Sequence, residues 1–160
     1  ARVRRAAAAD PALPKLVHLS VSNPTFVSPL GYYAGKARTA TMVRDSGLPW
    51  AVIRPTLIFG PGDILVNNIA WLLRHMPVFV IPERGTYRVQ PVAGEDVAEI
   101  AMWAAALSEN VVVDAAGPEI ISYADLVTSL AVPIRPRTDI VNLPPSTHPP
   151  AGAVDGIVVR

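Results

Sequence analysis

Two residues suited to acid/base chemistry, Tyr32 and Lys36, stand four positions apart in a stretch typical of the start of a helix. Because a helix rises about 1.5 Å per residue with about 3.6 residues per turn, residues at this spacing lie one above the other on one face. A cation held beside a tyrosine favours the phenolate and lets the tyrosine exchange protons closer to neutral pH. The pair therefore suits proton transfer at a carbonyl or alcohol centre, although a solvated face with a long lysine is the alternative.

The composition narrows the classes of protein and of site. Hydrophobic residues make up 51% of the 160 residues, yet no uninterrupted apolar run reaches the about 18 residues of a membrane span. The net charge of +1 gives no reason to expect a nucleic acid as a partner. The absence of cysteine excludes disulfides and thiolate chemistry, and the three histidines lack metal-ligand spacing. We expect a cytoplasmic protein without a metal, with a membrane-peripheral location as the alternative.

Apolar runs alternate with helical periodicity along the chain. Short apolar runs predict buried strands over 16–20, 50–54 and 110–114 and further short strands over 78–81 and 87–92. Helices are expected over 32–46, 64–75, 95–107 and from a capping box at 122–125 to about 130. Residues 2–9 look like the end of a helix, 55–63 like a turn-rich crossing, and the Pro-rich stretch from 133 onward like an irregular tail. This alternation predicts an α/β fold with a mainly parallel sheet.

Three features lie at or just after the ends of predicted strands. Ser20 ends the first predicted strand, the loop to Tyr32 comes next, and Pro55-Thr56 comes directly after the second strand. Because ligands of such sheets bind beyond the carboxyl ends of the strands, these features are expected to converge on one site. Ser22 competes with Ser20, since the spacing to Tyr32 allows either.

Two charged residues near these features are expected to be structural. Arg54 would pair with a carboxylate or carbonyl beneath its strand. Asp96 would begin a helix, where with Glu95 it complements the helix dipole, rather than act as a catalytic acid.

Taken together, the motifs resemble a known superfamily. In chain order they are Val17-His18-Leu19-Ser20, Tyr32-x-x-x-Lys36, Arg54-Pro55-Thr56-x-Ile58-x-Gly60-Pro61-Gly62-Asp63, Gln90-Pro91-Val92 and Glu95-Asp96-Val97-Ala98. Their order and spacing, over about residues 1–130, resemble the extended and atypical short-chain dehydrogenase/reductases of the NAD-dependent epimerase/dehydratase family. The variant at 90–92 is most similar to the NAD(P)-binding branch that includes the complex I accessory subunit and its bacterial relatives.

The resemblance implies a role for each motif residue. Ser20 would hold the substrate oxygen, and Tyr32 would be the general acid/base. Lys36 would bind the nicotinamide ribose hydroxyls and favour the phenolate. NAD or NADP would be the cofactor, and besides Tyr32 and Lys36 its contacts would come from Pro55, Thr56 and Ile58. The expected partner is a small-molecule substrate or an assembly partner, with association through an exposed sheet edge.

The resemblance also implies a domain organisation. The fold would be the C-terminal part of a Rossmann-like parallel sheet with a small substrate subdomain. The expected segments are 1–58 and 94–118 in the NAD(P)-binding domain, 59–93 and 119–132 in the substrate subdomain, and 133–160 as the irregular tail.

One family feature is missing from the sequence. A Rossmann cofactor site needs a Gly-rich turn that lets the backbone approach the pyrophosphate, and none of the ten glycines stands in G-x-G-x-x-G or G-x-x-G-x-x-G spacing. We therefore expect a fragment of a longer protein, with a partner that supplies the missing half, or lost dinucleotide binding, as alternatives. By itself the chain would bind NAD(P)H weakly or not at all and would be inactive.

Substrate recognition also departs from the pattern of the nucleotide-sugar members. Leu57 stands where they usually carry Asn, and 89–93 replaces their Arg-Asp-Tyr-Ile-His type of strand. The loss of these polar and cationic groups weakens the case for a diphosphate substrate. The expected function is an NAD(P)-dependent epimerase, dehydratase or reductase. The alternative is a non-catalytic dinucleotide-binding assembly subunit related to the NADH:ubiquinone oxidoreductase accessory subunit.

Overall fold

Residues 14–135 and 138–142 are described by the structure, a computed structural model. They divide into two compact units. Unit 1 holds the described residues up to Ile58 together with Val92–Gly117, and unit 2 holds Phe59–Pro91 and the described residues from Pro118 onward. The helix end expected at 2–9, and most of the tail expected to be irregular, lie outside the described residues.

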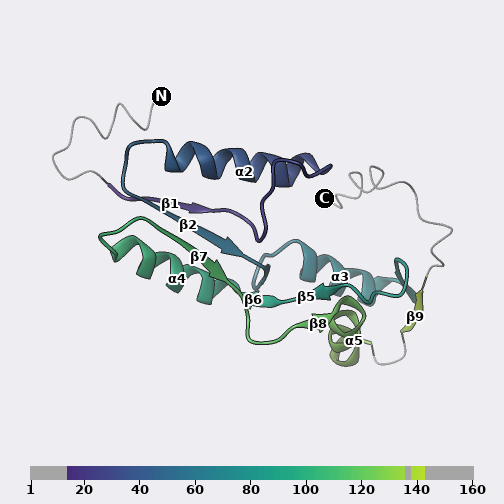
Figure 1. Cartoon of the computed structure of the whole chain (residues 1–160). Coiled ribbons are helices and arrows are strands. Elements are labelled where there is room, and N and C mark those ends of the chain that lie inside the picture. The colour runs from purple at the N-terminus through teal and green to yellow at the C-terminus, as the bar shows by residue number, and fades with distance from the viewer. Residues whose placement is uncertain (1–13, 136–137, 143–160) are drawn as a thin grey trace. The chain divides into compact units, whose positions relative to one another are not determined.

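Unit 1 is built on a three-stranded parallel sheet in the order β1-β2-β7 (Figure 1). Leu16 of β1 lies opposite Trp50 of β2, and Ala51 of β2 lies opposite Val111 of β7. The short strands β3 and β6 pair with each other where the chain leaves and re-enters the unit. The elements of this part of the chain are β1 (Leu16–Leu19), α2 (Gly31–Arg44), β2 (Trp50–Pro55), β3 (Leu57–Phe59), β6 (Pro91–Ala93), α4 (Gly94–Ala106) and β7 (Val111–Ala115).

The two long helices of unit 1 cover opposite faces of the sheet (Figure 1). Alternation along a strand sends successive side chains to opposite faces. Val52 accordingly packs with Val43 of α2, whereas Ile53 packs with Val97 of α4. The sequence therefore yields the predicted α/β architecture, with a parallel sheet between helices.

The outer strands of this sheet differ from the sequence expectation. β2 is mostly buried, as predicted, but β1 and β7 are only half-buried along their length. In the described part of the chain each outer strand has a strand neighbour on one side alone. Apolar content predicts a strand but does not reveal its place in the sheet.

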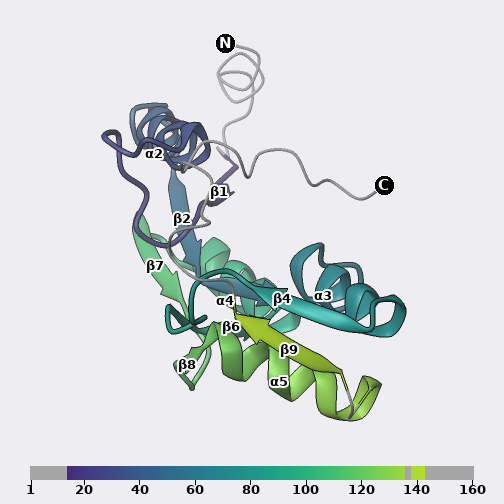
Figure 2. The ribbon, with the colours of Figure 1, turned by 90° about the vertical axis from the view of Figure 1, so that its right-hand side faces the viewer.

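Unit 2 packs two helices against short strand pairs (Figure 2). β4 pairs in parallel with β9, and β5 pairs antiparallel with β8. The core of the unit brings together Ile69, Leu73, Phe79, Ile81 and Val127. Its elements are α3 (Leu65–His75), β4 (Val78–Ile81), β5 (Arg88–Val89), β8 (Ile121–Ser122), α5 (Tyr123–Ile134) and β9 (Asp139–Asn142).

Two sequence expectations were wrong in detail. The crossing at 55–63 contains β3, and the stretch from 133 onward is not uniformly irregular, because α5 runs to Ile134 and β9 follows. Pro133 removes one helical hydrogen bond, and α5 ends one residue later. β9 owes its conformation to pairing with β4, where Ile140 lies opposite Phe79. A four-residue run carries too little periodicity to predict such a long-range contact.

Among the described helices, none combines the length and the apolarity needed to cross a lipid bilayer. Within the same residues, no three His, Cys, Asp or Glu side chains come together as metal ligands would.

Candidate functional site

Backbone hydrogen bonds gather the predicted site segments at the carboxyl edge of the unit 1 sheet. These hydrogen bonds extend the strand pairing past the ends of the strands. Ser20 N donates to Ile53 O at 2.7 Å, Ser22 N to Pro55 O at 2.9 Å and Thr56 N to Ala115 O at 3.0 Å. The ends of β1, β2 and β7 therefore lie together with the residues that follow them. The segments that were expected to converge therefore adjoin one another at this edge of the sheet.

Tyr32 and Lys36 meet beside the end of β1. Lys36 Nζ lies 5.7 Å from the centroid of the Tyr32 ring, as their spacing on a helix predicts. The same ammonium donates a hydrogen bond of 3.1 Å to the carbonyl oxygen of Leu19, the last residue of β1. Tyr32 is 61% exposed, so its side chain stays open to a ligand. The lysine thus joins the strand end to the tyrosine.

Small residues bring α2 onto the sheet and so position this pair. Ala37, Ala40 and Val43 are the buried residues of the helix. Tyr33 packs edge to face against Tyr32, with ring centroids 5.5 Å apart and planes at 86°. This contact limits the orientations of the Tyr32 ring.

The two candidate serines differ in accessibility. Ser20 is 5% exposed, and its Oγ is buried with no hydrogen-bond partner among the described residues. Ser22 is half-buried and precedes a turn in which Asn23 has a φ of 50°. Ser20 thus offers an unpartnered hydroxyl in a closed position, and Ser22 a more open one. Both serines remain candidates for the substrate oxygen.

The residues expected at the nicotinamide ring occupy three different environments. Pro55 is buried at the end of β2. Thr56 Oγ1 donates to Ala115 O at 3.4 Å, which ties the end of β2 to the end of β7. Ile58 in β3 is 37% exposed. Of these three side chains, that of Ile58 is exposed, whereas that of Thr56 links the ends of two neighbouring strands.

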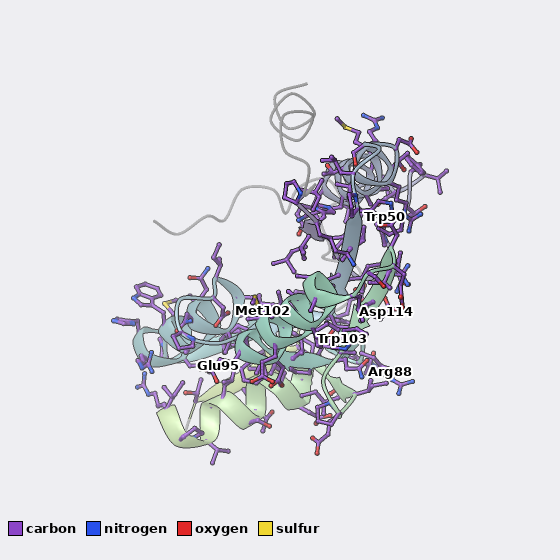
Figure 3. The ribbon with its side chains drawn as sticks, turned by 90° about the vertical axis from the view of Figure 1, so that its left-hand side faces the viewer. Trp50, Arg88, Glu95, Met102, Trp103 and Asp114 are labelled. Carbon is purple, nitrogen blue, oxygen red and sulfur yellow. The ribbon has the colours of Figure 1, made fainter. Side chains whose placement is uncertain are left out.

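Arg54 has the structural role that the sequence suggested. Its Nε and Nη2 donate to Asp114 Oδ1 and Oδ2 at 2.7 and 2.9 Å, a two-pronged pair across β2 and β7. The two residues lie opposite each other in the strand register, and Asp114 is labelled on β7 in Figure 3. Asp96 likewise lies in the first turn of α4 with Glu95, as expected for helix-start residues.

His18 is a site neighbour that sequence reasoning missed. It lies on β1 two residues before Ser20, and its Nε2 is buried without a hydrogen-bond partner among the described residues. Burial, and next the charge of Lys36, hold the pKa of the imidazole below its usual value. The signal in the sequence is the period of two along a strand, which places His18 on the same side as Ser20, the residue that follows β1.

A pocket of about 560 Å³ opens elsewhere on unit 1. Its lining includes Arg44, Trp50 and Asn110, at the amino ends of β2 and β7. It therefore lies at the opposite edge of the sheet from Tyr32 and Lys36.

Comparison with known proteins finds similarity in structure but not in sequence. No protein-family profile and no curated protein matches the chain. Solved structures do match. The UDP-glucose 4-epimerase of Thermotoga maritima, solved with UDP-glucose, is 17% identical with a TM-score of 0.70, and the match covers 84% of this chain and 52% of that one. The UDP-glucose 4-epimerase of Thermus thermophilus, in complex with NAD, is 19% identical with a TM-score of 0.64, over 83% and 52%.

A dehydratase gives a comparable match. The dTDP-glucose 4,6-dehydratase of Bacillus anthracis, in complex with NAD, is 16% identical with a TM-score of 0.69, over 81% of this chain and 49% of that one. None of these structures supports the alternative of a subunit related to complex I. The chain spans about half the length of the solved structures it matches, and over that half it has the Rossmann-like α/β fold of these epimerases and dehydratases.

Proposed function

We propose that this chain carries the acid/base part of an NAD(P)-dependent epimerase, dehydratase or reductase site, in which Tyr32 moves the proton. The observation that carries the proposal is the placement of Lys36, whose ammonium lies 3.1 Å from Leu19 O and 5.7 Å from the Tyr32 ring. A lysine on a merely solvated face would extend into water rather than bond to the end of a strand. This lysine lies at the sheet edge where open α/β sheets bind their ligands.

The fold supports the same class of protein. The matching structures are epimerases and a dehydratase, and two of the three are complexes with NAD. Since the identities are below 20%, the similarity concerns the fold, and the function rests on the residues of this site.

The residues present suit one end of a dinucleotide. The Lys36 ammonium can donate to ribose hydroxyls, and Tyr32, Pro55, Thr56 and Ile58 would flank the nicotinamide. No glycine motif of the kind that receives a pyrophosphate occurs among the ten glycines. These residues therefore fit the nicotinamide and its ribose in NAD or NADP. When bound, the nicotinamide supplies acceptance and return of a hydride.

Each residue has a definite part in proton transfer. Tyr32 takes the proton from a substrate alcohol as the carbon is oxidised, and returns a proton when the carbonyl is reduced. Lys36 places a positive charge 5.7 Å from the centroid of the Tyr32 ring, beside the group that moves the proton. The hydroxyl of Ser20, or of Ser22, donates a hydrogen bond to the substrate oxygen and keeps it within reach of Tyr32.

The loop between β1 and α2, which borders the site, favours a substrate whose reacting group is uncharged. Residues 19–35 contain no Asp, Glu, Lys, Arg or His. The loop between β1 and α2 exposes Phe26, Val27 and Leu30, at 59%, 89% and 43%. An apolar ketone or secondary alcohol suits this loop, because the loop itself offers a diphosphate no cation and the neighbouring Lys36 is already assigned to the nicotinamide ribose.

Replacing Tyr32 tests the proposal directly. In the intact protein we expect Tyr32→Phe to lower turnover of apolar ketones with NADH or NADPH by about 10²–10⁴-fold, the usual contribution of a general acid. Tyr33→Phe is the matched control, since it removes a hydroxyl from the adjacent ring of the same helix. Equal turnover by Tyr32→Phe and Tyr33→Phe would remove the acid/base role.

A further inference from the structure

The face of β1 that carries His18 is the face that α2 covers. Leu16 packs in the cluster of Ala40, Val43 and Val52, whereas Val17 packs in the cluster beneath α4. Because side chains alternate along a strand, His18 shares the side of Leu16, and Ser20 continues it where the strand ends. The imidazole therefore lies between the apolar core and the site serine.

Two buried polar atoms on this face lack partners among the described residues, namely His18 Nε2 and Ser20 Oγ. Buried polar atoms in native proteins almost always form a hydrogen bond with protein or with an ordered water. Leu19 stands between the two residues and carries the hydrogen bond from Lys36. The two unpartnered atoms therefore belong to the residues directly before and after Leu19, whose carbonyl holds Lys36.

Among the elements packed around His18, α2 supplies the charged group that acts on it. α2 contributes the Lys36 ammonium, which acts on His18 electrostatically. The β2 residues paired with β1, Trp50 to Ile53, carry no ionisable group, and β1 itself has none besides His18. A protonated imidazole would therefore face a second cation without an acidic group on these elements to offset it. Burial and Lys36 both favour the neutral ring.

We propose that His18 is a positioning residue of the Tyr32–Lys36 site. Its neutral imidazole accepts a hydrogen bond from a buried water, which also contacts the Ser20 hydroxyl. Because the ring is uncharged, it does not repel the Lys36 ammonium, which stays on the Leu19 carbonyl beside Tyr32. A protonated His18 would become a donor and a cation, and would drive Lys36 away from Leu19 and from the Tyr32 ring. The inference rests on the proposed function in that the positioned lysine is the one assigned to the site, but the contact itself requires no turnover.

Nuclear magnetic resonance titration of the 160-residue chain tests this coupling without a substrate. The signals of the His18 ring, the Lys36 side chain and the Tyr32 ring are followed from about pH 8 to about pH 5, the range in which histidine titrates. We expect Lys36 and Tyr32 to shift with the His18 midpoint, and His18→Gln to abolish that step. We also expect Lys36→Met to raise the His18 midpoint, because it removes the neighbouring charge.

His75→Gln is the control, because this histidine stacks on Trp71 of α3 in unit 2 and should leave the step unchanged. The proposal is overturned if Lys36 and Tyr32 do not respond when His18 titrates, or if Lys36→Met leaves the His18 midpoint in place. Should His18→Gln fail to fold, the Lys36→Met titration still decides the matter. Turnover that is insensitive to Tyr32→Phe would refute the proposed function while leaving the measured coupling intact, so the two failures are distinguishable.

Discussion

Lys36 is held by a backbone carbonyl rather than by a carboxylate. The carbonyl of Leu19 accepts its hydrogen bond at 3.1 Å and carries no net charge. The ammonium therefore keeps its positive charge for the Tyr32 ring, whereas an Asp or Glu partner would offset it. The proton transfer proposed for Tyr32 calls for a neighbouring cation of this kind, whose charge no carboxylate neutralises.

The two serines can be separated by substitution. We expect Ser20→Ala to lower turnover in the intact protein by about 10²-fold, the cost of removing one donor to a developing oxyanion, and Ser22→Ala to lower it less. Because Ser20 Oγ has no protein partner among the described residues, its removal breaks at most the hydrogen bond to the proposed buried water and should lower the free energy of unfolding by no more than about 1 kcal/mol. Kinetics and denaturant unfolding of both variants check this. A larger kinetic loss in Ser22→Ala would transfer the role to Ser22.

His18 makes stability depend on pH. Its pKa is lowered in the folded chain, by burial first and by Lys36 second. The unfolded chain therefore binds the proton more readily, so this contribution to stability is complete above the ordinary histidine pKa of about 6.5 and is lost as pH falls toward the folded pKa. Urea unfolding at pH values on both sides of this range should show a decline on acidification that is smaller in His18→Gln. An equal decline in both proteins would contradict the assignment.

Site residues were predictable where local spacing fixes geometry. The helical spacing of Tyr32 and Lys36 and the strand-end position of Ser20 were sufficient to anticipate their convergence. The pairing of Arg54 with a carboxylate was anticipated, but its partner Asp114, 60 residues away, depends on strand register. His18 escaped notice because burial beneath α2 gives it its properties, and burial is a tertiary feature.

At the scale of elements, one local capping signal predicted the start of a helix well. The capping box that opens α5 is present, with Ser122 Oγ accepting from Asp125 N at 3.0 Å and Asp125 Oδ2 accepting from Ser122 N at 3.4 Å. By contrast, β3 and β9 were not anticipated. Each is short and depends on a partner strand that is distant in sequence. The capping box thus marks where α5 begins, while long-range pairing decides whether a short run becomes a strand.

Glycine substitutions at two loops should have very different costs. A Cβ at Gly85 would lie 2.7 Å from Ile81 Cγ2 and 3.1 Å from Ala124 Cβ, and φ there is +61°. We expect Gly85→Ala to destabilise the fold by about 2–4 kcal/mol through overpacking and left-handed strain. Gly47→Ala, with φ of +77° and open space around it, carries the strain alone and should cost about 1–2 kcal/mol. Denaturant unfolding compares the two, and equal costs would show that the contact at Gly85 relaxes.

At the scale of the whole molecule, each unit has a core of its own. Unit 1 buries Ile53 and Val52 on the two faces of its sheet, and unit 2 buries Leu73 and Val127 between its helices and strands. The fold class followed from the alternation of strands and helices. The half-buried outer strands did not, because a chain that spans about half of its structural relatives offers no local sign of what adjoins its sheet edges.

We expect copies of the chain to associate through the edge of β1 that has no strand neighbour among the described residues. In the described part of the chain, β1 ends the sheet order β1-β2-β7, and an outer strand presents unpaired backbone groups to another chain. We expect sedimentation to show species heavier than the 17.0 kDa monomer as concentration rises. Leu19→Lys should shift the chain toward monomer, because a charge on an edge strand opposes pairing. Trp103→Lys is the control, since this residue is 55% exposed and lies on α4 rather than on the edge strand (Figure 3). A monomer at every concentration would refute edge pairing, and dissociation by Trp103→Lys alone would move the interface to α4.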